Sequence, residues 1–145
     1  MSENELRKLP SLLLQAREAA GLSQRELARL LGVHPTHLCG FERGRRRIGQ
    51  PGFLEQFAST LQLPMATLSQ LRWALAHDQT IDQARQAGLS EVATGLVSVA
   101  LQLERELEHV ELVGVQQVLA TALRSKRFLR SYSDPAAPTR QEALP

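Results

Sequence analysis

Arginine side chains provide the clearest candidate for binding chemistry in this chain. The run Arg45-Arg46-Arg47 begins a segment, 45–52, whose turn residues and missing helical periodicity predict a loop, and Arg43 ends the helix expected before it. Residues 1–75 carry ten Lys/Arg against six Asp/Glu, whereas residues 76–145 carry seven against nine, within a net charge of +2. A basic first half suits a polyanion partner. The alternative is that the arginines form only a solvated loop.

Other reactive residue types lack the spacing that a site would need. His34, His37 and Cys39 could ligate a metal, but no second cluster completes a tetrahedral set, so we expect no metal. Cys39 is the only cysteine, which excludes an intramolecular disulfide and agrees with a reducing compartment; we interpret it as a small helix residue rather than a redox sensor. No catalytic arrangement or phosphate-binding glycine loop is evident, so no catalytic residue, cofactor or enzyme activity is expected.

The elements that position the arginines are two short helices joined by a turn. Leu27 and Leu31 lie four residues apart on one helical face, and Ala28 is small enough for a second helix to approach closely. Gly32 stands where a tight turn requires a positive φ. The apolar face resumes on the second helix with Val33, Leu38 and Phe41. Such short helices cannot bury these residues alone, so flanking helices must pack against them.

The composition predicts an all-α fold, because Leu, Ala, Gln, Glu and Arg are abundant and long β-branched runs are missing. Ser23 and Glu26 form an S-x-x-E capping box that begins one helix. Five short helices are expected in a first domain of residues 1–76, at about 9–20, 24–31, 35–43, 53–61 and 64–76.

A helical dimerisation or interaction region is expected at residues 77–132, followed by a disordered tail at 133–145. A short helix at 79–86 precedes a long helix from about residue 90 to 110. The apolar residues of this long helix recur at near-heptad spacing and predict a narrow seam that requires a partner, either a helix of the same chain or a second copy: Val92, Leu96, Val99, Leu103, Leu107 and Val110. A last helix is expected from about 111 to 129, with Gly114 as a candidate kink.

Within residues 9–75, the pieces LSQ-x-ELA-x-x-LGV and FE-R-G-R resemble the lambda-repressor-like, or Xre and Cro/repressor, family of five-helix DNA-binding domains. The resemblance implies that the helix at 35–43 enters the major groove of double-stranded DNA. It places Pro35, Thr36, His37 and Gly40 toward the bases, although Pro35 and Gly40 have no hydrogen-bonding side chain, so Thr36 and His37 are expected to carry direct readout.

The same resemblance assigns phosphate contacts to a larger set: Ser23, Gln24, Arg25, Arg43, Arg45, Arg46 and Arg47. Gln24 would also brace the recognition helix, and Arg7 with Lys8 would form a basic N-terminal arm.

The function that these features predict is a homodimeric transcriptional regulator, more specifically a repressor, on an inverted-repeat operator. The alternative is an antitoxin or adaptor whose C-terminal helices bind another protein while the first domain autoregulates its operon. No apolar run approaches the ~18 residues of a membrane span, and the polar N-terminus is unlike a signal peptide. We therefore expect a cytoplasmic, nucleoid-associated protein of bacterial or phage type that makes no membrane contact.

Overall fold

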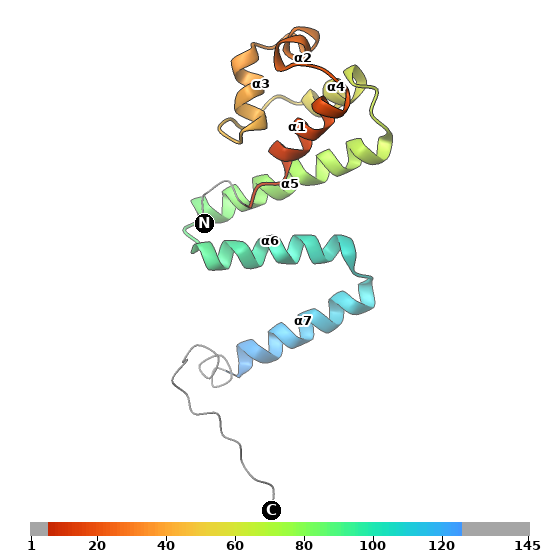
Figure 1. Cartoon of the computed structure of the whole chain (residues 1–145). Helices are drawn as coiled ribbons and strands as arrows, with labels where there is room; N and C mark the ends of the chain where they lie inside the picture. Colours follow the sequence, from red (N-terminus) through yellow and green to blue (C-terminus); the bar gives the residue numbers. More distant parts are fainter. Residues whose placement is uncertain (1–5, 126–145) are drawn as a thin grey trace, which may run out of the picture. The chain divides into compact units, whose positions relative to one another are not determined.

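The computed structural model describes residues 6–125, and within this range the chain is all-helical without strands. Seven helices follow one another: α1 (Leu9–Ala19), α2 (Gln24–Leu31), α3 (Pro35–Glu42), α4 (Phe53–Thr60), α5 (Met65–Gln86), α6 (Glu91–Glu106) and α7 (His109–Arg124) (Figure 1). The described residues fall into two compact units that divide between Leu101 and Gln102. The expected all-α class is confirmed. The tail predicted at 133–145 lies outside the described residues.

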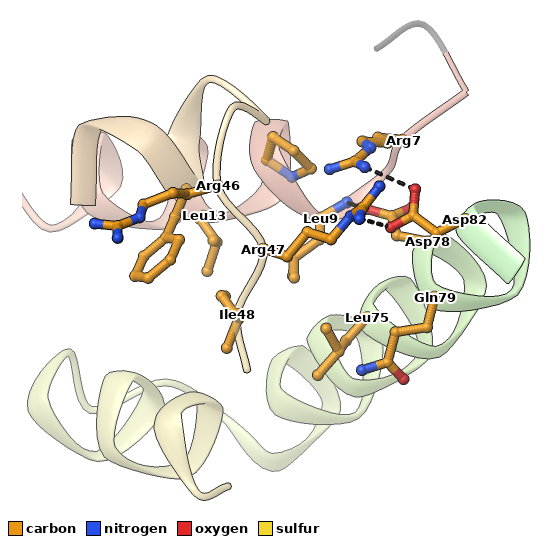
Figure 2. A pocket seen from close by; sticks show the side chains of 12 residues that line it. Arg7, Leu9, Leu13, Arg46, Arg47, Ile48, Leu75, Asp78, Gln79 and Asp82 are labelled. Atoms are coloured by element: carbon orange, nitrogen blue, oxygen red, sulfur yellow. Dashed lines mark hydrogen bonds and ion pairs between the residues drawn. The ribbon is translucent and has the colours of Figure 1, made fainter. Parts of the chain in front are cut away.

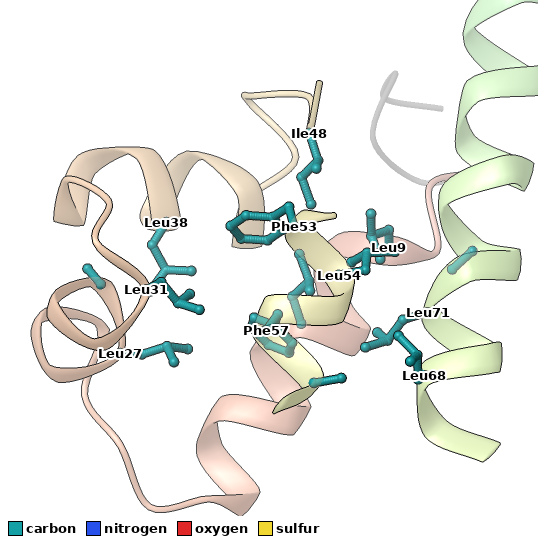
Figure 3. Packing of buried hydrophobic residues seen from close by; sticks show 14 residues of the cluster. Leu9, Leu27, Leu31, Leu38, Ile48, Phe53, Leu54, Phe57, Leu68 and Leu71 are labelled. Atoms are coloured by element: carbon teal, nitrogen blue, oxygen red, sulfur yellow. The ribbon is translucent and has the colours of Figure 1, made fainter. Parts of the chain in front are cut away.

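One apolar core joins α1 to α5. Leu13 of α1, Leu27 of α2, Leu38 of α3 and Phe57 of α4 are completely buried, and Leu71 of α5 is nearly so. Figure 3 shows Leu27, Leu31 and Leu38 facing Phe57 across this core. Burying one such side chain contributes roughly 1.5–3 kcal/mol, so the five helices support one another where none would be stable alone.

Helix α2 begins at the predicted capping box and ends at the predicted glycine. The Ser23 hydroxyl accepts a hydrogen bond from the Glu26 backbone N–H at 3.2 Å, and the Ser23 N–H donates to the Glu26 carboxylate at 2.8 Å. Gly32 ends α2 in the left-handed conformation with φ 66°. A residue with a Cβ adopts this conformation at a cost of roughly 1–2 kcal/mol, so glycine suits the turn into α3.

Helix α5 is longer than its sequence suggests. The break expected near His77 is wrong, because one helix runs from Met65 to Gln86, and the proposed domain boundary after residue 76 falls inside it. His77, Asp78 and Asp82, which resemble solvent-facing residues in the sequence, are buried. Their hydrogen-bond partners come from other parts of the chain, so these polar side chains are satisfied inside the protein and the helix continues through them.

Helix α1 receives its N-terminal cap from this buried stretch of α5. The Asp78 carboxylate accepts hydrogen bonds from the backbone N–H groups of Lys8 and Leu9, at 2.8 and 3.0 Å. Lys8, at the N-cap position, supplies no side-chain cap of its own. A carboxylate at a helix N-terminus also interacts favourably with the helix dipole.

Beyond α5, the helix boundaries differ from the prediction. Helix α6 ends at Glu106 instead of near Val110, and α7 begins at His109, where the side chains and backbones of Glu108 and Glu111 make a reciprocal capping box. Helix α7 continues through Gly114 without ending there. The predicted end of the last helix, near residue 129, lies outside the described residues. No helix between residues 6 and 125 is both long and apolar enough to cross a membrane.

Candidate nucleic-acid interface

The first turn of α3 presents two hydrogen-bonding side chains to solvent. Thr36 and His37 are exposed, whereas Leu38, one residue later, is completely buried. His34 caps the helix, since its Nδ1 accepts a hydrogen bond from the Thr36 backbone N–H at 3.2 Å, and Pro35 occupies the first helical position, where no N–H is needed. The side of α3 opposite the core therefore begins with a hydroxyl and an imidazole.

The C-terminal end of α3 is fixed by a buried carboxylate. Glu42 accepts hydrogen bonds from two nitrogens of the Arg17 guanidinium on α1, at 2.6 and 3.0 Å, and from the Gln24 amide nitrogen on α2, at 2.6 Å. The Glu42 side chain is only 1 % exposed. The hydrogen bond that Arg17 donates to Glu42 raises the pKa of Arg17 above its usual value, so the guanidinium stays charged at all ordinary pH. Three helices thus meet at the Glu42 carboxylate, which fastens the C-terminal end of α3 to α1 and α2.

Gln24 therefore does part of what the sequence predicts. Its amide braces α3 through Glu42, and a phosphate contact by the same side chain stays a prediction. Arg17 and Glu42 were missed as positioning residues at the sequence level. The signal was present in the FE-R-G ending, but Arg17 lies 25 positions before Glu42, and only the packing of α1 on α3 brings them together.

The arginines that follow α3 differ in their surroundings. Arg45, Arg46 and Arg47 are all exposed, but the Arg47 Nε lies 2.6 Å from an Asp82 oxygen on α5. Figure 2 shows Arg46 and Arg47 leaving the loop in opposite directions, Arg47 toward Asp82. Buried Ile48 fastens the loop after them. For Arg47 to bind a phosphate as Arg45 and Arg46 are expected to, it would have to give up its ion pair with Asp82.

The predicted basic arm at Arg7 and Lys8 is wrong for Arg7. The Arg7 guanidinium donates to the other Asp82 oxygen at 2.7 Å and to the Gly44 carbonyl at 3.3 Å, and its side chain is only 11 % exposed. The physical reason is Asp82, a buried carboxylate that needs cationic partners. Arg7 therefore ties the chain before α1 to the loop after α3.

Close to these ion pairs lies a small cavity of about 40 Å³ between α1, the arginine loop and α5 (Figure 2). Its lining includes Leu9, Ile48 and Leu75. Pockets for metabolites are typically ~300 Å³ or larger, so this one has room for water only.

Two expected phosphate-contacting residues lie at the N-terminus of α2. Ser23 and Arg25 are exposed there, and the Ser23 hydroxyl is used in the capping box. Arg43, at the end of α3, is also exposed. The N-terminus of α2 is the positive end of that helix and favours anions, whereas Arg43, at the negative end of α3, could attract an anion only through its own charge.

A buried polar cluster joins α5 to α6 and was missed by the sequence analysis. His77 Nε2 lies 2.9 Å from the Ser98 hydroxyl, and His77 Nδ1 lies 2.9 Å from an Asp78 oxygen. This is a Ser-His-Asp arrangement, but His77 is 2 % and Ser98 1 % exposed, so no substrate can reach the hydroxyl. Asp78 is also engaged by the N-terminus of α1. The cluster holds α6 against α5.

Helix α6 buries two small polar residues and exposes three large apolar ones. Thr94 and Ser98 are buried, whereas Val92, Leu96 and Val99 are 77, 64 and 51 % exposed. We call Val92, Leu96 and Val99 the α6 stripe. Leu103 continues their spacing on α6 and is half-buried.

The predicted seam does not continue beyond α6. Leu107 follows the last residue of α6, and Val110 belongs to α7. The expectation of one continuous six-residue helical face is therefore wrong, because the capping box at Glu108 begins a new helix.

The predicted metal-type residues do not gather into a site. Cys39 is half-buried, and the rings of His34 and His37 lie 6.1 Å apart edge to face. In the part of the chain that the structure describes, no three His, Cys, Asp or Glu side chains come together in a way that could hold a metal ion.

Comparison with protein families agrees with this geometry. The family model of a helix-turn-helix domain matches residues 11–71, from α1 into α5, and leaves α6 and α7 outside the match. The match agrees with the resemblance to lambda-repressor-like domains. The chain has no match among curated proteins.

Proposed function

Because residues 11–71 are a helix-turn-helix domain, we propose that this protein is a transcriptional repressor that binds an inverted-repeat operator as a homodimer. The observation that carries the proposal is the mounting of α3. Its first turn exposes Thr36 and His37, while Leu38 is buried in the core and Glu42 is locked to α1 and α2. A rigid helix with polar residues at its exposed end is suited to the major groove.

We infer that Thr36 and His37 supply direct readout. The threonine hydroxyl can donate to or accept from base edges, its methyl group can contact thymine, and imidazole can bond to a purine edge. Pro35 is half-buried and has no polar side-chain atom, so its part in the proposed contact is limited to shape.

Phosphate binding would fix the register of α3. Exposed candidates precede α3 along the chain, Ser23 and Arg25, or follow its last residue, Arg43, Arg45 and Arg46. If a dimer neutralises about six phosphates, its affinity for DNA falls roughly a thousandfold between 50 and 200 mM salt.

The α6 stripe supports pairing with a second copy of the chain. Its residues Val92, Leu96 and Val99 step by four and three, the spacing with which two helices pack along a seam. A symmetric pair would bury the same face of both copies and would present two recognition helices to two half-sites about one DNA turn apart. Repression then requires only occupancy of a promoter.

Helix α7 favours the second candidate, a regulator whose C-terminal helix binds another protein. This helix has no buried residue, and several of its large apolar side chains are exposed, among them Val110, Val118 and Leu123 at 79, 69 and 73 %. An antitoxin or adaptor would use such a surface for its partner.

One experiment addresses the proposal as a whole. The full-length protein selects duplexes from a random pool at moderate salt, and the selected duplex is footprinted while the mass of the complex is measured in solution. We expect a protected inverted repeat occupied by two chains. Failure to enrich any sequence, or a single chain on an asymmetric site, contradicts the proposal.

A further inference from the structure

Gly40 is half-buried and lies one helical turn after Thr36 and His37. A Cβ added at Gly40 would lie 3.1 Å from the Cβ of Arg46 and 3.3 Å from its Cγ and Cδ. Those contacts are tighter than normal van der Waals packing. The aliphatic stem of Arg46 therefore occupies the space that a side chain at position 40 would need.

The backbone prevents Arg46 from moving away easily. The N–H groups of Arg45 and Arg46 both donate to the Gly40 carbonyl, at 2.9 and 3.0 Å. Because these bonds hold the start of the loop against α3, a Cβ at position 40 could be accommodated only by lengthening them or by turning the Arg46 stem outward.

The neighbouring arginine serves a different purpose. Arg47 is paired with Asp82 on α5 and points away from Arg46 (Figure 2). Its exposed guanidinium is paired with Asp82, a carboxylate that it shares with Arg7, whereas the stem of Arg46 lies against α3 at Gly40.

We propose that Gly40 is a positioning residue, which seats the Arg46 stem on α3 so that the Arg46 guanidinium binds a DNA phosphate next to the bases that Thr36 and His37 contact. Arg47 instead fastens the loop to α5. This inference rests on the proposed DNA-binding function. In this proposal Gly40 contacts no base and acts only by positioning Arg46. Arg46 binds phosphate, whereas Arg47 pairs with Asp82.

The test is a double-mutant cycle on the full-length protein, using the duplex that the unmodified protein selects. Arg46→Ala should weaken binding about tenfold and reduce the slope of affinity against salt by roughly one phosphate. Gly40→Ala should cause a similar loss, and combining the two should add little, because both remove the same contact.

Two control variants distinguish the contact between Gly40 and Arg46 from the effects of replacing any helical glycine or any arginine of the loop. Gly114→Ala also replaces a helical glycine, but no atom lies within 4 Å of its added Cβ, so DNA affinity should not change. Arg47→Ala should leave the salt slope as it is. If Gly40→Ala lowers the melting temperature, adding Arg46→Gly, which removes the Cβ at 3.1 Å, should restore it.

Additive losses from Gly40→Ala and Arg46→Ala, an unchanged affinity of Gly40→Ala, or a melting temperature that Arg46→Gly fails to restore would each overturn the inference. Failure of the proposed function gives a different result, in which the unmodified protein selects no duplex. If the unmodified protein selects a duplex but the losses from Gly40→Ala and Arg46→Ala are additive, only the proposed role of Gly40 is rejected.

Discussion

Replacing Glu42 with glutamine tests the ion pair that holds α3 to α1. The substitution keeps the size of the side chain but removes its charge and turns one acceptor oxygen into an NH2 group. Arg17, whose side chain is 12 % exposed, would then lack its carboxylate, and Gln24 would face a weaker acceptor or a second donor.

The expected loss follows from burial. Breaking a buried ion pair by removing one partner costs ~3–5 kcal/mol. We expect about 3 kcal/mol, the lower end of that range, because Arg17 keeps its hydrogen bond to the Leu22 carbonyl at 2.8 Å. For a domain of this size the melting temperature should fall by roughly 12–24 °C.

Fluorescence of Trp73 is a suitable assay. It is the only tryptophan, and it packs against the α1–α5 core, so its signal follows that unit. The matched control is Glu55→Gln, because the Glu55–Arg72 pair has a similar length of 2.8 Å but side chains that are 49 and 51 % exposed. The control should lose about 0.5 kcal/mol or less. Equal losses in the two variants would refute the reasoning.

Three further outcomes are expected. The hydrogen bond from the Ser23 backbone N–H lowers the pKa of Glu26 in the folded protein. The stabilisation that ionised Glu26 gives the fold is therefore complete above its unfolded-state pKa of about 4.3, and it is lost as the pH falls through the lower folded-state pKa. Glu26→Gln should make the free energy of unfolding less dependent on pH in this acidic range, and an unchanged dependence would contradict this. Gly32→Ala should cost about 1 kcal/mol in urea unfolding, because φ is 66° there, and a neutral effect would argue against the strain. Leu96→Lys should convert a dimer into a monomer in sedimentation equilibrium without lowering the Trp73 unfolding midpoint; an intact dimer would remove the α6 stripe from the interface.

The first four helices and the beginning of α5 could be predicted from the sequence because local signals and packing agree there. Ser23 and Gly32 mark the ends of α2 by their own chemistry, and the apolar periodicity of Leu27 and Leu31 identifies the face that is buried. Such agreement between local and tertiary preferences makes a segment predictable.

The polar core could not be predicted in the same way. Asp78 caps a helix about 70 positions away, and Asp82 binds Arg7 at 75 positions. A polar residue that is buried with a distant partner has the same sequence pattern as one in solvent, so His77 and its neighbours suggested a helix end where α5 continues. For the same reason Arg7 was expected in a DNA-binding arm.

The sequence predicted which residue types lie at the candidate site, but it could not predict that neighbouring arginines have different partners. Thr36 and His37 are exposed as a recognition helix requires. The different environments of Arg46 and Arg47 depend on Gly40 and Asp82, and nothing in a run of three arginines distinguishes its members.

The central claim is that the exposed first turn of α3 reads base pairs. The most direct measurement compares the sequences that the unmodified protein and His37→Ala select from the same random pool. We predict that His37→Ala loses preference at one position, repeated symmetrically in both half-sites, at a cost of ~1–3 kcal/mol, and keeps its preference elsewhere. An identical set of selected sequences, or a uniform loss of affinity for all DNA, would contradict it.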